Sequence, residues 1–312
     1  MMMNKNENKI YTVTLNPAVD YYLGFDNFKE GKLNSPRTAY TLPGGKGINV
    51  SKVLANFEQK SIALGFVGGF TGDYMRTSLR EEDIEFKFTE LEEDTRINIK
   101  INNNGLETEI SGKAPKISES KKEEFLKKLI EIQKTDILIL SGSIPKSLNE
   151  NIYSEIICNV PRETKVILDS RGKGFDLALR EGVFLVKPNQ IELEEYFNRK
   201  IETLEEFIFA GKELQKLGAE NVLISLGEKG SVLVTKNLVY KGNVPKGKMI
   251  STVGAGDSMV AGIVYGLNKY GTIENAYKYG IASGSATAFS EGLGKFELME
   301  SLLTMIEIEV II

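Results

Sequence analysis

The chain has no histidine, and it has a single cysteine among its 312 residues. The absence of histidine excludes serine–histidine hydrolases, histidine metal sites and histidine general bases. Any general base must therefore be Asp, Glu, Lys or Tyr. Because Cys158 stands alone, it can form neither a disulfide within the chain nor a cysteine cluster that holds zinc, which fits a reducing cytoplasm.

Long apolar runs and an excess of basic residues are also missing. No apolar stretch approaches the ~20 residues that span a bilayer, and the polar segment Met1 to Lys9 lacks the apolar core of a signal peptide. We therefore expect a cytoplasmic protein without a membrane partner. The formal net charge of −4 gives no global basic field for nucleic acid, although local lysines and arginines can still hold a small anion.

The hydrophobic fraction of 41% is enough for a substantial core in a chain of this length. The length alone allows either two ordinary domains or one large α/β unit. No linker rich in Pro, Ser or charge divides the chain. We expect a single domain over residues 1–312, with disorder limited to the first few residues.

Short apolar runs alternate with amphipathic stretches along most of the sequence. The runs have the length of buried parallel strands and occupy Ser61–Val67, Asp136–Leu140, Lys165–Leu168, Val183–Val186 and Asn221–Leu226. Helices are predicted over Ser120–Ile132, with Phe125, Leu126, Leu129 and Ile130 on one face, and over Thr203–Leu217; each begins with a capping box, Ser120 with Glu123 and Thr203 with Glu206. The alternation predicts an α/β fold with a doubly wound, mainly parallel sheet flanked by helices, whose ligands bind beyond the carboxyl ends of the strands.

One region departs from this alternation. Residues Phe86–Thr89, Thr95–Ile101 and Leu106–Ser111 alternate polar with apolar side chains, and Asn102 to Gly105 is turn-like. We interpret the region as a small antiparallel β lid, formed by two separate segments at about 20–42 and 86–112.

The segment Ser251-Thr-Val-Gly-Ala-Gly-Asp257 places glycines before a stretch with helical apolar spacing. Free backbone N–H groups at a helix N-terminus suit the charge that develops on a transferring phosphoryl group, and an adjacent aspartate can accept a hydroxyl proton. The segment does not match G-x-G-x-x-G, because Met259 stands at the third glycine position, and a dinucleotide fingerprint fails. In isolation, Asp257 is equally explained as a first-turn acid of a helix.

A second glycine-rich turn, Pro43-Gly-Gly45-Lys46-Gly47-Ile-Asn49, also precedes a predicted helix. It is no Walker A loop, because Gly47 stands where Ser or Thr should follow the lysine. Backbone amides, Lys46 and Asn49 can instead bind an anionic or hydroxylated substrate, although such glycines are often purely structural.

Asn189 and Glu192 follow a buried strand in Lys187-Pro-Asn189-Gln-Ile-Glu192 and share a helical face. They can organise hydrated Mg²⁺, which takes few protein ligands, or they can simply form a helix cap. Both roles are compatible.

Two further patterns are individually weak. The turn Ser225-Leu226-Gly227-Glu228-Lys229-Gly230 can cradle a nucleotide, and a plain hairpin explains it equally well. Arg96, Asn98 and Lys100 share one face of a strand, where they can clamp a phosphate or form an ordinary solvated face.

Five segments taken together resemble the PfkB (ribokinase-like) carbohydrate kinases over nearly the whole chain. They are Thr14-Leu-Asn-Pro-Ala-Val-Asp20, Gly44-Gly-Lys-Gly-Ile-Asn49, Lys187-Pro-Asn189, Ser225-Leu-Gly227 and Val253-Gly-Ala-Gly-Asp257. The first segment and Ser141-Gly-Ser143-Ile-Pro resemble the branch that contains 1-phosphofructokinase and tagatose-6-phosphate kinase. Thr95 to Lys100 is more similar to the former.

The resemblance implies a ribokinase-like fold, ATP as phosphoryl donor, Mg²⁺, and a sugar phosphate as acceptor. It implies that Asp257 is the base, that Gly254, Ala255 and Gly256 form the anion hole, and that Asp20 binds sugar hydroxyls. The implied substrate contacts also include Gly45, Lys46, Gly47, Asn49, Arg96, Asn98 and Lys100, and the implied ATP contacts are Lys187, Asn189, Ser225, Leu226, Gly227, Glu228, Lys229, Gly230, Gly256 and Asp257. A homodimer through the lid is a further expectation, because an exposed small sheet has reason to be covered.

We expect phosphorylation of fructose 1-phosphate at its C6 hydroxyl, giving fructose 1,6-bisphosphate. Tagatose 6-phosphate is the alternative substrate, and a non-catalytic sugar-phosphate sensor is an alternative of another class. Asp169-Ser170-Arg171-Gly172 departs from the family pattern, in which small residues follow the aspartate, and the resemblance assigns no role to Arg171.

Overall fold

The computed structural model describes residues 8–311. Two predictions concern the N-terminal segment: it lacks a signal peptide, and its first few residues are disordered. Residues 1–7 of this segment lie outside the described residues. No helix within residues 8–311 combines the length and the apolar character needed to cross a bilayer.

Within the described residues, eleven strands form the main sheet in the order β15-β14-β13-β12-β11-β10-β9-β1-β4-β5, with β6 also paired to β4. Its strands are β1 Ile10–Thr14, β4 Ile62–Gly68, β5 Glu85–Phe86, β6 Thr89–Leu91, β9 Ile137–Ser141, β10 Lys165–Asp169, β11 Val183–Val186, β12 Ala219–Ser225, β13 Ser231–Val234, β14 Val239–Gly242 and β15 Ile308–Val310. Pairing is parallel from β12 through β1 to β5 and antiparallel from β12 to β15.

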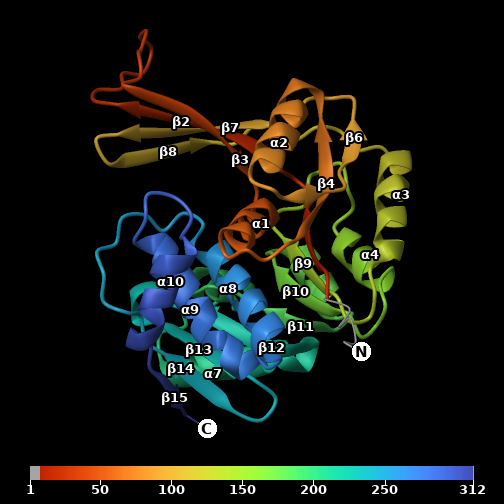
Figure 1. Cartoon of the computed structure of the whole chain (residues 1–312), viewed down its shortest axis with the longest axis vertical. Coiled ribbons are helices and arrows are strands. Elements are labelled where there is room, and N and C mark those ends of the chain that lie inside the picture. Colours follow the sequence, from red (N-terminus) through yellow and green to blue (C-terminus); the bar gives the residue numbers. More distant parts are fainter. Residues whose placement is uncertain (1–7, 312) are drawn as a thin grey trace, which may run out of the picture.

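Helices cover both faces of this sheet (Figure 1). They are α1 Lys46–Asn56, α2 Gly69–Glu81, α3 Glu119–Lys128, α4 Ile152–Cys158, α5 Lys173–Leu179, α6 Gln190–Phe197, α7 Leu204–Leu217, α8 Ala255–Tyr270, α9 Ile273–Ala288 and α10 Phe296–Leu302, with short 3₁₀ turns at Leu129–Glu131, Gly227–Lys229 and Leu303–Met305. Alternate side chains of β9 show how the layers divide: Leu138 and Leu140 pack with α3–α7, whereas Ile137 and Ile139 pack with α1 and α8–α10. Both faces of a parallel strand are thereby buried, which explains its uninterrupted apolar run.

The predicted doubly wound, mainly parallel sheet is confirmed, and each predicted strand overlaps an observed one with a shift of at most a few residues. The capping box of Thr203 and Glu206 at the start of α7 is also present. The cap predicted for α3 is wrong: Ser118, not Ser120, accepts the hydrogen bond at the helix start. Ile130 is also misplaced, because the helix tightens into a 3₁₀ turn after Lys128 and leaves this side chain 78% exposed.

A second sheet of four strands projects from the main body at the upper left of Figure 1. Its order is β3-β2-β7-β8, with bounds β2 Ala18–Phe25, β3 Thr38–Gly44, β7 Ile97–Asn103 and β8 Leu106–Ile110. We call it the small sheet. It is mixed and not antiparallel throughout, because β2 and β7 run parallel while the outer pairs are antiparallel.

The prediction that Phe86–Thr89 belongs to the lid is wrong, since β5 and β6 pair with β4 of the main sheet. Phe86 and Phe88 stack with ring centroids 5.3 Å apart and pack against the hydrophobic cluster below the small sheet. An edge strand is buried on one side only, so its alternating pattern resembles that of an exposed hairpin. The turn between β7 and β8 is as predicted: Asn104 and Gly105 both have positive φ, 52° and 88°, as a two-residue hairpin loop requires.

Candidate functional site

Two helices begin beside the carboxyl ends of the central strands, each immediately after a glycine. Gly45 precedes α1 with φ 131°, and Gly254 precedes α8 with φ 78°. Space also requires glycine here, because a Cβ on Gly45 would lie 2.6 Å from Cγ2 of Thr14, and one on Gly47 would lie 2.6 Å from its Oγ1. Both glycine-rich segments therefore open helix N-termini, as their patterns predicted, and α1 packs against α8.

Asp257 is the third residue of α8, and its side chain is buried. Asn49 of α1 donates a hydrogen bond from Nδ2 to Asp257 Oδ2 at 2.7 Å. Burial and the nearby charge of Asp169 raise the pKa of Asp257 to about 6, although Asn49, Lys46 and Lys187 stabilise its ionised form. A carboxylate with a pKa close to neutral is both ionised at pH 7 and able to take up a proton, which is the property of a general base.

A buried cluster of charges links α1 to the ends of β10 and β11. Asp169 lies at the end of β10, with Lys46 Nζ 3.0 Å from Oδ1 and Lys187 Nζ 3.6 Å from Oδ2. Burial alone would raise the pKa of Asp169, but the two lysines hold this pKa below its ordinary value. Burial likewise opposes the charge of Lys46, yet Asp169, Asp257 and Glu192 raise the pKa of the ammonium.

Lys187 also reaches the start of α8. A Cβ on Gly256 would lie 3.1 Å from Lys187 Nζ, so the absence of a side chain there leaves room for the ammonium beside the helix N-terminus. The segment around Lys187 and the segment around Asp257 therefore meet at the start of α8. Ala255 and Gly256 form the first turn of α8 between them.

Asn189 and Glu192, which follow β11, form a capping box at the start of α6, so the predicted helix cap is confirmed. Asn189 Oδ1 accepts from the backbone N–H of Glu192 at 2.8 Å, and Glu192 Oε2 accepts from the N–H of Asn189 at 2.9 Å. Glu192 Oε1 lies 3.9 Å from Lys46 Nζ. The cap thus fixes this carboxylate beside the charge cluster.

The side chains around Asp169 and Glu192 fit a metal ion that keeps most of its water ligands. Within residues 8–311 no group of three or more acidic or cysteine side chains could enclose an ion. Asp169 Oδ2 is nevertheless buried without a hydrogen bond, and Glu192 Oε1 is not needed for the cap. A hydrated Mg²⁺ that also binds phosphate oxygens requires few protein carboxylates. The metal role of Asn189 and Glu192 stays a prediction.

The turn predicted to contact a nucleotide lies next to this cap. Asn189 and Ser225 form a parallel bridge, and the N–H of Ser225 donates to the Pro188 carbonyl at 3.1 Å. Residues Leu226 to Gly230 connect β12 to the antiparallel β13, with Gly227 and Gly230 at positive φ. The turn is a hairpin, and Gly227, Glu228 and Lys229 are exposed at its tip. Its contact with nucleotide stays a prediction.

The predicted sugar-phosphate residues of the small sheet gather around Asp20. Asn98 Nδ2 donates to Asp20 Oδ1 at 2.8 Å, and Lys100 Nζ lies 3.4 Å from Asp20 Oδ2. The side chains of Asp20 and Lys100 are only 13% and 22% exposed, so they do not form a freely solvated face. Burial opposes the charge of Lys100, but Asp20 raises the pKa of this ammonium.

Arg96 is anchored separately from that group. Its guanidinium donates to the Asn16 carbonyl at 3.1 Å and to Ser111 Oγ at 2.8 Å. Asn16 in turn donates from Nδ2 to Ser143 Oγ at 3.1 Å. Burial lowers the pKa of Arg96 from its ordinary value. Arg96, the residue before β7, therefore lies at the ends of β1 and β9, whereas Asn98 and Lys100 of β7 contact Asp20.

Asp169, Asn16, Ser141 and Ser143 lie at the site but were not predicted as functional residues. Within the described residues, four buried side-chain oxygens at the carboxyl ends of β1, β9 and β10 make no hydrogen bond: Thr14 Oγ1, Asn16 Oδ1, Ser141 Oγ and Asp169 Oδ2. An unpartnered buried polar group costs roughly 1–3 kcal/mol, so such a concentration marks a place for a ligand or for water. They lie at the strand ends, where such sheets bind ligands, but no local pattern in the sequence distinguishes these side chains.

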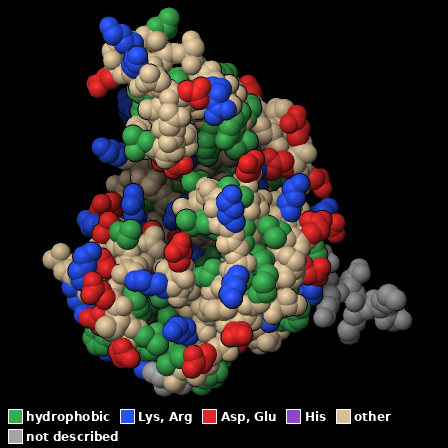
Figure 2. Space-filling model, turned by 90° about the vertical axis from the view of Figure 1, so that its left-hand side faces the viewer, with side chains coloured by type: hydrophobic (Ala, Val, Ile, Leu, Met, Phe, Trp, Pro, Cys, Tyr) green, Lys and Arg blue, Asp and Glu red, His purple; other side chains and the backbone are tan. Residues whose placement is uncertain are grey.

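These groups converge at the carboxyl ends of β1, β9 and β10. Figure 2 shows that the molecule is hollowed between its upper part and the main body. A buried aspartate, two helix N-termini and two lysines lie at the same edge of the sheet. The arrangement can bind anions, take a proton from a hydroxyl and stabilise a developing negative charge.

Comparison with known proteins gives consistent matches. The family model described as pfkB family carbohydrate kinase matches residues 10–298. A 1-phosphofructokinase of Bacillus subtilis strain 168 is 46% identical over 301 residues, covering 96% of this chain and 99% of that protein. A D-tagatose-1-phosphate kinase of Bacillus licheniformis is 38% identical over 304 residues, covering 96% and 99%.

Among solved structures, a putative phosphofructokinase from Staphylococcus aureus superposes with a TM-score of 0.86 at 37% identity, covering 97% of this chain and 99% of that one. The match extends over both sheets and both helix layers. Motifs, fold and relatives agree, and the chain belongs to the pfkB family of carbohydrate kinases.

Proposed function

We propose that the protein transfers the γ-phosphoryl group of ATP to the C6 hydroxyl of fructose 1-phosphate, giving fructose 1,6-bisphosphate and ADP. The observation that carries the proposal is the placement of Asp257. It is a buried carboxylate with a pKa of about 6, held by Asn49 at the N-terminus of α8. Asp257 accepts the hydroxyl proton as the sugar oxygen attacks the γ-phosphorus and the bond to the bridging oxygen of ADP breaks.

The start of α8 stabilises the group in transfer. Backbone N–H groups at the start of α8 face the charge on the equatorial phosphate oxygens, and Lys187 lies beside them. Gly254 and Gly256 supply these groups, whereas the N–H of Ala255 donates to the Thr252 carbonyl at 3.2 Å. Lys46 stands between Asp169 and Asp257 and adds a second positive charge. The protein forms no covalent bond to the phosphoryl group in this mechanism, because the reaction depends chiefly on positioning and electrostatics.

The sugar phosphate binds between the small sheet and the ends of β1 and β9. Asp20 is placed to accept hydrogen bonds from sugar hydroxyls, with Asn98 and Lys100 holding its carboxylate in place. The phosphate binds to Arg96 and to the neighbouring side chains of Asn16 and Ser143, whose polar atoms lie together at the strand ends.

The nucleotide binds on the opposite side of the charge cluster, over Lys187, Asn189 and the turn Ser225 to Gly230. Mg²⁺ enters as part of the substrate MgATP and neutralises phosphate charge. Glu192 Oε1 and Asp169 Oδ2 are the carboxylate oxygens nearest to its water ligands; Asp169 Oδ2 makes no hydrogen bond but lies 3.6 Å from Lys187 Nζ. Because ATP and the ketose phosphates are cytoplasmic metabolites, the proposal places the protein in the cytoplasm.

The identity of the sugar is the finer part of the proposal. Relatives named 1-phosphofructokinase reach 46% identity, against 38% and 34% for those named tagatose 1-phosphate and tagatose 6-phosphate kinase. Tagatose 6-phosphate is therefore the weaker candidate. A non-catalytic sensor is disfavoured because the base and both glycine turns are intact.

Release of ADP from MgATP in the presence of fructose 1-phosphate, tagatose 1-phosphate, tagatose 6-phosphate and fructose 6-phosphate tests this proposal. We expect the largest kcat/KM with fructose 1-phosphate. A larger kcat/KM with either tagatose phosphate would identify that sugar as the substrate instead. No release of ADP with any of the four sugar phosphates would favour the non-catalytic sensor.

The small sheet supports a second part of the proposal, a homodimer through this element. Its register places Tyr21, Ile99 and Ile110 on one face, opposite to Asp20 and Lys100. On the apolar face Tyr21, Ile97, Leu106 and Ile110 are 36–68% exposed. A second copy of the same face is the occupant that matches exposed apolar side chains on three neighbouring strands, β2, β7 and β8.

Sedimentation velocity measures this association. The parent should sediment as a dimer, Ile110→Asp as a monomer, and Glu107→Ala, on the other face of β8, as the parent does. A parent that remains monomeric at tens of micromolar would contradict the dimer. In this proposal the chain is one kinase domain over residues 1–312, with the small sheet as its lid.

A further inference from the structure

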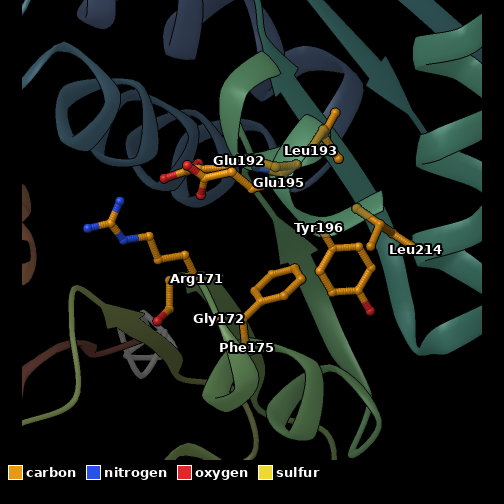
Figure 3. A pocket seen from close by; sticks show the side chains of 10 residues that line it. Arg171, Gly172, Phe175, Glu192, Leu193, Glu195, Tyr196 and Leu214 are labelled. Carbon is orange, nitrogen blue, oxygen red and sulfur yellow. The ribbon is translucent and has the colours of Figure 1, made fainter. Parts of the chain in front are cut away.

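A cavity of about 120 Å³ lies beside the loop that follows β10, between α5 and α6. One side of it is apolar, with Phe175 and Tyr196 in edge-to-face contact at 5.7 Å between ring centroids. The other side carries Arg171, Glu192 and Glu195. Figure 3 shows the guanidinium and both carboxylates projecting to the same side, away from the two rings.

This charged side adjoins the proposed active site through Glu192. The same carboxylate closes the helix cap and lies 3.9 Å from Lys46 Nζ. Arg171 follows Asp169 by two residues, so its backbone leaves the sheet at the same edge. Its side chain is exposed and can turn toward a molecule bound above Glu192.

The charges of the buried cluster leave the phosphate chain short of positive partners, and Lys229, the other cation assigned to the nucleotide, lies at the exposed tip of its turn. Asp169, Asp257 and Glu192 bring three carboxylates to the site, and Lys46 and Lys187 bring two ammonium groups. Both lysines lie against Asp169. A triphosphate chain adds further negative charge, which a single Mg²⁺ balances only in part. A further cation at this edge would bind the phosphate chain without competition from Asp169.

We propose that Arg171 binds the terminal phosphates of the nucleotide and thereby distinguishes ATP and ADP from AMP. This inference rests on the proposed function, because it needs the nucleotide to lie over Glu192 and Asn189. A guanidinium is always charged, and its planar fork matches two phosphate oxygens at once. Among the cations of this edge, Arg171 has the geometry for such a paired contact.

Calorimetric binding of MgATP, MgADP and AMP to the intact protein tests the role without turnover. Arg171→Ala should weaken MgATP and MgADP binding roughly 10-fold or more, because a hydrogen-bonded charge is lost, and should leave AMP unchanged. Arg171→Lys should recover part of the loss as a point charge. Arg162→Ala is the matched control, since this exposed arginine precedes the other end of β10.

The outcomes separate this inference from the proposed function. A parent that binds no MgATP would refute the nucleotide site itself. If the parent binds MgATP and Arg171→Ala binds it equally well, or loses affinity for AMP to the same extent, the assignment of Arg171 is wrong. A selective loss of fructose 1-phosphate binding would overturn it too. Melting temperatures of the four proteins should agree within a degree or two, because the side chain is exposed.

Discussion

Replacing Asp257 by asparagine should increase stability and abolish most activity in the same protein. Burial and Asp169 raise the pKa of Asp257 from 3.8 to about 6 in the folded state. One pKa unit corresponds to about 1.4 kcal/mol, so at pH 8 the ionised carboxylate destabilises the fold by roughly 3 kcal/mol relative to the unfolded chain. Asparagine has nearly the same shape and no charge, and its side-chain oxygen can still accept from Asn49.

The sign of this contribution sets its pH range. Because the folded pKa is the higher one, the folded state binds the proton more tightly, and the stability from this group falls as pH rises from about 4 to 6. Above pH 6 the full penalty is present, and there the melting temperature of Asp257→Asn should exceed that of the parent by several degrees. Below pH 4 the two should melt together.

Turnover should change in the opposite direction. A positioned base contributes about 10²–10⁴ in rate, and the N–H groups of Gly254 and Gly256 remain to supply residual activity. Glu274→Gln is the matched control, because Glu274 is an acidic residue in the first turn of α9, as Asp257 is in α8, and both helices are 16 residues long. It should cost stability slightly, by about 0.3–1 kcal/mol, and leave turnover unchanged. An Asp257→Asn protein within a few-fold of parental turnover would refute the general-base role.

Three further predictions follow from the same geometry. The kcat/KM of the parent should rise with pH up to about 6 and then level off, because Asp257 must be ionised to accept a proton; a profile flat from pH 5 to 8 would argue against this. Glu192→Gln should raise the magnesium concentration needed for half-maximal rate while retaining the melting temperature, since glutamine also completes a capping box, and an unchanged magnesium titration would remove the metal role. Arg96→Ala should weaken sugar-phosphate binding at least 10-fold without affecting MgATP, with the exposed Arg80→Ala as control; an equal loss for both ligands would place the phosphate elsewhere.

The sequence predicted the fold wherever burial on both faces produces an uninterrupted apolar run. It failed where two solutions have the same local pattern. Ser118 and Ser120 both suit a helix cap, and the alternating residues around Phe86 and Phe88 suit an edge strand of either sheet. Only the tertiary pairing with β4 decides the second case.

The glycine-rich segments of the candidate site were recognisable in the sequence, because the backbone at these helix N-termini requires glycine, either for a positive φ or for lack of space. Asp169 was missed as a site residue, since an aspartate at a strand end has no local signature and its role depends on lysines 123 and 18 residues away. The metal and capping roles of Glu192 were indistinguishable in sequence, and the structure shows that the cap itself holds Glu192 near Lys46.

The central claim is that the γ-phosphoryl group of ATP moves to C6 of fructose 1-phosphate with Asp257 as the base. Phosphorus NMR of the protein incubated with MgATP and fructose 1-phosphate tests it most directly, because it reports both the donor and the esterified carbon. The account predicts ADP and a new phosphate ester at C6 in equal amounts with the parent, and only a trace of either with Asp257→Asn. Loss of ATP without a C6 ester, or undiminished ester formation by Asp257→Asn, would contradict it.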